Sequence, residues 1–173
     1  MHFDLVDRVI EHGQHRIVTI KNVTGAEEYL QDHFPGYPVL PGVMMLEAMV
    51  QAARRMLVLS QRPGASRLVL GRVRALKYGR FVRPGDALLV EVILKKESEG
   101  AIDFDATARL IRATEIARVH APLSPGAGSP AADPAGVASP GTLGGDAEPR
   151  ELPVAASGKI TLRAVRLANR ALA

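Results

Sequence analysis

Apolar and polar residues alternate along several stretches of the chain, and this period of two is typical of half-buried β-strands. The same alternation predicts strands over 16–23, 68–82, 87–97, 102–112 and about 154–167. The clearest case is 102–112, where the positions expected to face a core are Ile102, Phe104, Ala106, Ala108 and Leu110. Turn-forming residues at 84–86 and 98–100 separate neighbouring strands, as hairpins require.

A helical pattern replaces the alternation at 43–59. Apolar residues fall on every face of its first three turns, which is typical of a helix buried on all sides. Pro41 lies near the first turn, a position that tolerates proline, so we expect a central helix over about 41–60. A shorter amphipathic helix is predicted around 4–11. Because one long helix accompanies a run of strands, the pattern predicts an α+β domain.

The domain organisation follows from length and composition. The chain has 173 residues, of which 47% are hydrophobic, and this is enough to bury one globular core. Between 122 and 150 the sequence holds six prolines and six glycines but few large apolar residues. We therefore expect a core over 1–121, a disordered insertion over 122–150, and a final strand with a C-terminal tail over 151–173. The insertion is either a neutral linker or a partner-binding element.

The absence of certain residues and segments narrows the class of protein. No cysteine is present, which excludes disulfides and cysteine-ligated zinc and is compatible with a cytoplasmic location. No signal peptide is visible at the N-terminus. Charged residues interrupt the apolar stretch at 43–59, so we expect a core helix and not a membrane span.

Two residues are candidates for acid and base chemistry. His33 precedes three prolines and two glycines within 34–42, and such a constrained loop can hold a side chain accurately. Glu47 is the one charge in the first three turns of the helix, and an apolar site favours the neutral form of a carboxylic acid. Together they could form a general base and a general acid. The alternatives are a surface histidine and a glutamate where the helix emerges at a subunit edge.

The segment that holds both residues matches a known pattern. It reads H-F-P-G-x-P-x-x-P-G-V-x-x-x-E-A-x-x-Q from His33 to Gln51, with every fixed position filled. It resembles the 3-hydroxyacyl-(acyl-carrier-protein) dehydratases of dissociated fatty acid synthesis. Further landmarks stand in the expected order at 5–9, 21–24 and 83–86, so the resemblance covers about 4–112 and a closing strand. The segment between Gly71 and Pro84 is one residue longer than in the family.

The resemblance implies a hotdog fold, in which a curved antiparallel sheet wraps one long central helix. It also implies a dehydration in which His33 removes a proton from C2 of a 3-hydroxyacyl thioester. Protonated Glu47 donates to the departing C3 hydroxyl, and a trans-2-enoyl thioester and water result. In the family the two residues meet across a dimer interface, so a homodimer is expected. Assembly of three dimers into a hexamer stays open.

The resemblance extends to substrate binding. The backbone amide of Gly42 is expected to bind the thioester carbonyl at the helix N-terminus, with Val43 beside it. Gly42 could equally serve only to start the helix. Gln51 follows Glu47 by one turn and could orient the carboxylate or solvate a subunit contact.

Acyl carrier protein is the partner that the resemblance implies. This protein is acidic and carries the substrate on its phosphopantetheine, so no further cofactor and no metal are expected. The net charge is +4, and the basic residues expected to dock the carrier are Arg72, Arg74, Lys77, Arg80 and Arg83. An ordinary solvated strand face is the alternative. Nucleic acid binding is not expected, because no nucleic-acid-binding motif accompanies this cluster.

Hotdog domains also perform other functions, so two alternatives are kept. The first is an acyl thioesterase in which the carboxylate activates water. The second is a non-catalytic hotdog subunit that binds acyl chains. The presence of both His33 and Glu47 argues against the second, because a scaffold needs neither.

Overall fold

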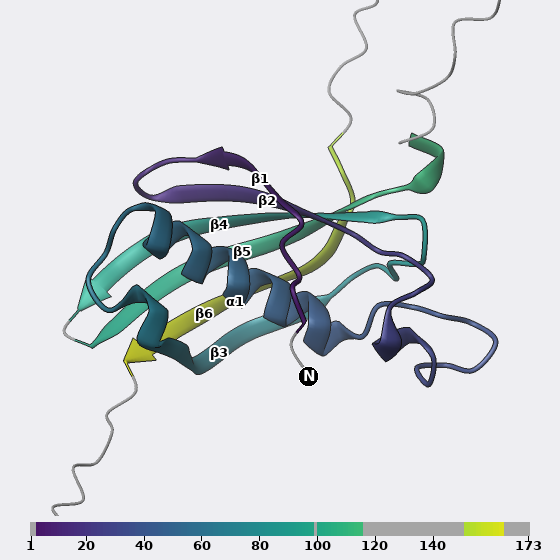
Figure 1. Ribbon diagram of the computed structural model, residues 1–173, viewed down its shortest axis with the longest axis horizontal. Helices are drawn as coiled ribbons and strands as arrows, with labels where there is room; N and C mark the ends of the chain where they lie inside the picture. Colours follow the sequence, from purple (N-terminus) through teal and green to yellow (C-terminus); the bar gives the residue numbers. More distant parts are fainter. Residues whose placement is uncertain (1–2, 99, 116–150, 165–173) are drawn as a thin grey trace, which may run out of the picture.

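The computed structural model describes residues 3–98, 100–115 and 151–164, and its elements are drawn in Figure 1. One long helix, α1, runs from Gly42 to Leu59 and is accompanied by two short 3₁₀ helices, η1 (Glu28–Leu30) and η2 (Ala65–Arg67). The described strands are β1 (Arg8–His12), β2 (Arg16–Asn22), β3 (Leu68–Tyr78), β4 (Ala87–Ser98), β5 (Ala101–Ile111) and β6 (Val154–Ala164).

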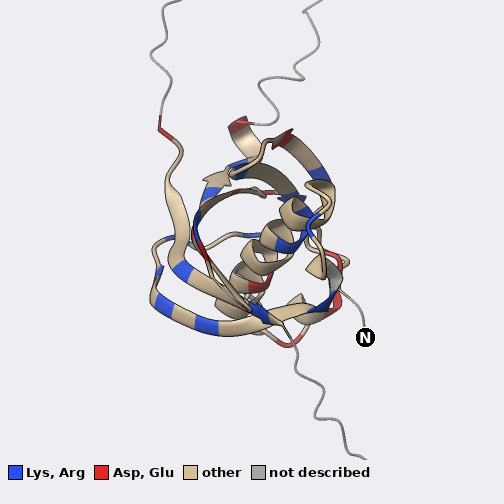
Figure 2. Ribbon diagram, turned by 90° about the vertical axis from the view of Figure 1, so that its left-hand side faces the viewer, with Lys and Arg blue, Asp and Glu red and all other residues tan. Residues whose placement is uncertain are grey.

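The strands form one antiparallel sheet in the order β1-β2-β4-β5-β6-β3. The sheet curves around α1, as the view along the helix in Figure 2 makes clear. β6 returns beside β5, with the Thr161 hydroxyl donating to Asp103 at 2.5 Å. The helix and strands confirm the α+β class and the hotdog fold. The insertion expected at 122–150 lies outside the described residues.

The core lies between the sheet and α1. Every second residue of β5 is buried, as the alternation predicted. From the helix, the side chains that face the sheet repeat at intervals of three and four residues, and they are Met45, Ala48, Met49, Ala52, Ala53 and Met56. This spacing places them on one side of the helix.

The expectation that α1 is buried on all sides is wrong for the single chain. Val43 is 67% exposed and Val58 is 52% exposed, and both lie on the side of α1 away from the sheet. The reason is that the sheet covers one face of the helix, while among the described residues only the N-terminal segment crosses the other face (Figure 1). Glu47 and Gln51 lie on this outer face and are half-buried.

The helix predicted around 4–11 is also wrong. This segment ends in the strand β1, which pairs with β2 through a tight turn in which the Gly13 amide donates to the Arg16 carbonyl at 2.8 Å. The Asp7 amide already bonds the Ile20 carbonyl at 3.0 Å. Pairing with β2 gives hydrogen-bond partners to backbone groups that would have none at the ends of a short helix. The β-branched Val9 and Ile10 also favour a strand.

β3 is shorter than predicted and is irregular. The strand ends at Tyr78, although the Gly79 amide still donates to the Ala155 carbonyl of β6 at 2.9 Å. By Val82 the chain has turned to the loop before α1, where the Val82 carbonyl accepts from the Leu40 amide at 2.8 Å. Between Arg74 and Lys77 the pairing with β6 shifts by one residue, and Ala75 there has a φ of 50°. A second shift lies between Leu70 and Arg72, so β3 pairs with β6 through two irregularities of the β-bulge kind.

Candidate active site

A tight turn precedes the central helix and shapes the loop that carries His33. The Tyr37 amide donates to the Phe34 carbonyl at 2.8 Å, which closes a four-residue turn. Pro35 and Gly36 occupy its two central positions, and Gly36 has a φ of +80°. This is the arrangement of a type II turn, in which proline fixes the first central residue and glycine permits the second. The proline and glycine of the sequence pattern thus have a conformational role.

His33 is held in one tautomer. Its Nδ1 lies 2.9 Å from the carbonyl oxygen of Val39. A carbonyl can only accept, so Nδ1 carries the hydrogen and Nε2 of the neutral ring keeps its lone pair. Val39 is 1% exposed, which fixes the acceptor. The loop therefore leaves Nε2 as the nitrogen of His33 that can accept a proton.

His33 lines a pocket of about 590 Å³. The start of α1 supplies Gly42, Val43 and Met45, and the end of β3 with the residues after it supplies Tyr78, Gly79, Arg80 and Phe81. Phe34, Val39, Leu40 and Pro41 complete the lining. The structure thus brings four of the predicted site residues into one largely apolar pocket, namely His33, Gly42, Val43 and the predicted docking residue Arg80.

The N-terminus of α1 directs hydrogen-bond donors at this pocket. The Pro41 carbonyl accepts from the amides of Met44 and Met45, at 2.9 and 3.2 Å. Within the described residues, the amides of Gly42 and Val43 have no backbone acceptor, as expected for the first turn of a helix. The positive end of the helix dipole adds to them. Both amides can therefore bind an oxygen that gains negative charge.

Tyr78 was not singled out from the sequence, although it lies directly against Gly42. A Cβ built at Gly42 would lie 2.8 Å from two carbons at the phenol end of this ring. A residue with a Cβ at position 42 would thus have to displace the Tyr78 ring. Burial raises the pKa of Tyr78. The sequence signal that could have identified Tyr78 is its position as an aromatic residue at the end of a strand that is otherwise rich in basic residues.

Glu47 and Gln51 lie outside this pocket. The Gln51 Nε2 donates to Glu47 Oε1 at 3.0 Å and to the Phe3 carbonyl at 2.9 Å. Glu47 lies more than one helical turn beyond Gly42 and Val43, and it is not among the residues that line the pocket. The single chain therefore keeps the predicted acid away from the pocket of the predicted base.

The five predicted docking residues are all exposed. Arg72, Arg74 and Lys77 lie in β3, which is the lowest strand in Figure 2. Arg80 and Arg83 come after the end of β3 in the chain. Within the described part of the chain none of the five forms an ion pair. Arg83 lies 4.2 Å from the centre of the Tyr37 ring, so it joins this basic surface to the His33 loop.

No group of three or more His, Cys, Asp or Glu side chains is arranged to hold a metal ion in the described part of the chain. None of its helices combines the length and the apolar character needed to cross a membrane.

The chain is similar to known families and proteins over most of its described length. The model of the FabA-like domain matches residues 1–116. The chain belongs to this family. A 3-hydroxyacyl-(acyl-carrier-protein) dehydratase FabZ of Pediococcus pentosaceus is 42% identical over 102 residues, which are 58% of this chain and 67% of that protein. The FabZ of Thermus thermophilus is 47% identical over 92 residues, 51% of this chain and 63% of that protein. The chain thus spans about two thirds of the length of these FabA-like relatives.

Solved structures support the fold. The dehydratase heterocomplex ApeI:P from Xenorhabdus doucetiae aligns with a TM-score of 0.55 at 17% identity, over 94% of this chain and 99% of that one. The smu.793 protein of Streptococcus mutans, bound to acetyl CoA, gives 0.55 at 10% identity, over 95% and 92%. At such identities the likeness establishes the hotdog fold of the FabA-like chain and no activity.

Proposed function

We propose that this protein is a hydro-lyase that dehydrates 3-hydroxyacyl-(acyl-carrier-protein) to the trans-2-enoyl form in fatty acid synthesis, with His33 as base and Glu47 as acid. The observation that carries the proposal is the His33 tautomer. Its Nδ1–H donates to the Val39 carbonyl at 2.9 Å, and the ring lines the same pocket as the N-terminal residues of α1. The relatives of the FabA-like chain named above are dehydratases of this kind.

The base step follows from this arrangement. The His33 Nε2 takes a proton from C2 of the thioester substrate, and the electron pair of that C–H bond moves toward the thioester carbonyl. The amides of Gly42 and Val43 stabilise the oxygen that becomes negative, which is the costly part of proton removal beside a carbonyl. The apolar walls of the pocket suit an acyl chain.

The acid step requires a second copy of the chain. As the C3–O bond breaks, protonated Glu47 of the partner subunit donates its proton to the leaving hydroxyl, which departs as water. The position of Glu47 outside the pocket of its own chain supports this division. β3 is an edge strand of 11 residues with exposed apolar side chains at Val69 and Leu70. Such an edge favours pairing with another strand, and Tyr78 at its end lines the pocket.

The acyl carrier protein docks on the exposed basic residues of β3 and of the segment after it. Arg80 lines the same pocket as His33, so the docking surface reaches the entrance that a phosphopantetheine would use. The cationic residues attract the acidic carrier and speed its encounter. The carrier brings the substrate, so no other cofactor is needed, and the reaction belongs in the cytoplasm.

Incubation of the purified protein with a 3-hydroxyacyl carrier protein tests the proposal. We expect enoyl product, and we expect His33→Ala and Glu47→Gln each to lower kcat by about 10²–10⁴-fold. Release of a free acid would instead identify a thioesterase. No turnover would favour a non-catalytic subunit. Either of these results would contradict the proposal.

A further inference from the structure

The side-chain amide of Gln51 is fixed by the backbone of the N-terminal segment. The Leu5 amide donates to Oε1 at 2.8 Å, and Nε2 donates to the Phe3 carbonyl at 2.9 Å. If the amide were rotated by half a turn, its Nε2 would face the Leu5 amide and its Oε1 would face the Phe3 carbonyl. Donor would then face donor and acceptor would face acceptor, so only one orientation is compatible with both bonds. The second hydrogen of Nε2 then reaches Glu47 Oε1 at 3.0 Å.

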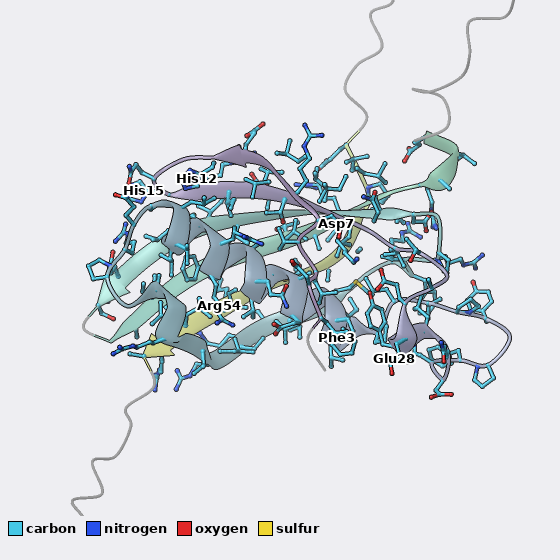
Figure 3. All side chains as sticks on the ribbon, viewed as in Figure 1. Phe3, Asp7, His12, His15, Glu28 and Arg54 are labelled. Atoms are coloured by element: carbon cyan, nitrogen blue, oxygen red, sulfur yellow. The ribbon has the colours of Figure 1, made fainter. Side chains whose placement is uncertain are left out.

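The N-terminal segment is itself anchored at both ends. Figure 3 labels Phe3 and Asp7, between which the segment crosses the outer face of α1. The Phe3 ring stands edge-on to Tyr29, with the ring centres 5.4 Å apart. At the other end the Asp7 carboxylate accepts from the Asn22 amide at 2.7 Å and from Lys21 Nζ at 3.2 Å.

Lys21 makes the second anchor rigid. Only 7% of this residue is exposed, and its ammonium group also bonds Glu27 at 2.9 Å. A buried charge keeps its place only with such partners. The family landmarks at 5–9 and 21–24 have no role in the proposed dehydration steps. The hydrogen bonds of Asp7 with Lys21 and Asn22 connect these two landmarks. Their connection holds the segment that bonds Gln51.

We propose that the segment from Phe3 to Asp7 is a positioning element for the acid Glu47 and acts through Gln51. This inference rests on the proposed function. Because Oε1 of Glu47 already accepts from Gln51, the acidic proton is placed on Oε2. The segment therefore determines which oxygen of Glu47 donates to the leaving hydroxyl, and it restricts the rotamers of a half-buried glutamate.

A double-mutant cycle in kcat tests this coupling. Phe3→Ala removes the contact with Tyr29, and we expect it to lower kcat about tenfold with little change in KM. In a Gln51→Leu background the same substitution should change kcat less than about twofold, because its route to Glu47 is already gone. Phe3→Tyr keeps the ring and should retain kcat. Val9→Ala truncates a half-buried side chain nearby, and we expect it to lower Tm while leaving kcat unchanged.

Equal losses of kcat in both backgrounds, or no loss in the wild-type background, would overturn the inference. A second measurement does not depend on turnover. The Gln51 side-chain amide hydrogens can be assigned in NMR spectra by their absence from Gln51→Leu. We expect them to exchange with water more slowly than those of the exposed Gln61, and Phe3→Ala should speed their exchange about tenfold. Unchanged exchange would overturn the inference even if the protein had no dehydratase activity.

Discussion

The turn that carries His33 can be tested by adding one methyl group to Gly36. This residue has a φ of +80°, and a Cβ built on it meets no atom within 4 Å. Gly36→Ala therefore introduces backbone strain without a steric clash, and the strain of an L-residue in this region is about 1–2 kcal/mol. Because the turn is exposed, it can relieve the strain locally by opening, which moves His33.

The strain sets the size of the effect. If opening relieves 1–2 kcal/mol, the ratio of the catalytic to the opened conformation falls about 5- to 30-fold, and kcat falls by up to the same factor. Gly64→Ala is the matched control, since Gly64 has a φ of +73° and equally open space, and it follows the far end of α1. We expect the control to lower Tm by about 2–4 °C per kcal/mol and to keep wild-type kcat.

Steady-state kinetics with a 3-hydroxyacyl carrier protein and thermal unfolding followed by circular dichroism measure both quantities. Two results would refute the reasoning. One is a Gly36→Ala protein with wild-type kcat and wild-type Tm, because the backbone strain must lower one of these two quantities. The other is an equal loss of kcat in Gly64→Ala, because the effect would then not come from the His33 turn.

Three further predictions follow from the same geometry. Gly42→Ala should push the Tyr78 ring aside and lower kcat/KM without loss of helical circular dichroism; Tyr78→Ala in that variant should restore part of the activity, and no restoration would exclude the clash as the cause. Burial lowers the pKa of Lys21, but hydrogen bonds to Glu27 and Asp7 outweigh it and leave the pKa raised above 10.5. The native state thus holds this proton more tightly than the unfolded state, so stability is lost as pH rises beyond 10.5, and urea titrations should show a smaller alkaline loss for Lys21→Met; an equal loss would contradict this linkage. Arg74→Glu should raise KM for the carrier-bound substrate about tenfold but leave KM for a small-thiol thioester unchanged, whereas the exposed Arg8→Glu on the opposite sheet edge should change neither; an equal rise for both substrates would argue against docking.

Elements with an unambiguous period were predictable from the sequence. The alternation of β5 and the boundaries of α1 agree with the structure to within one or two residues, because residue burial in a one-sided sheet directly determines the pattern. The segment 4–11 was misjudged because its strand is stabilised by pairing with β2, and such tertiary contacts override local periodicity.

The candidate site was predictable in its residues but not in its geometry. The sequence pattern identifies His33, Gly42 and Glu47, and the family resemblance implies that His33 and Glu47 come from different chains. The structure adds the pocket itself, from whose lining Glu47 is absent. Tyr78 and the Phe3 carbonyl escaped the prediction for physical reasons. Tyr78 approaches Gly42 through a bulged edge strand, and the Phe3 contact uses backbone atoms, which any residue possesses.

Complementation between two inactive variants tests most directly whether the active site is built from His33 of one chain and Glu47 of another. His33→Ala and Glu47→Gln proteins are unfolded, mixed in equal amounts and refolded together. Random pairing gives half mixed dimers, each with one intact site, so about a quarter of the wild-type activity should return. Activity that stays at the level of the separate variants, although mixed dimers are present, would contradict a site shared between subunits.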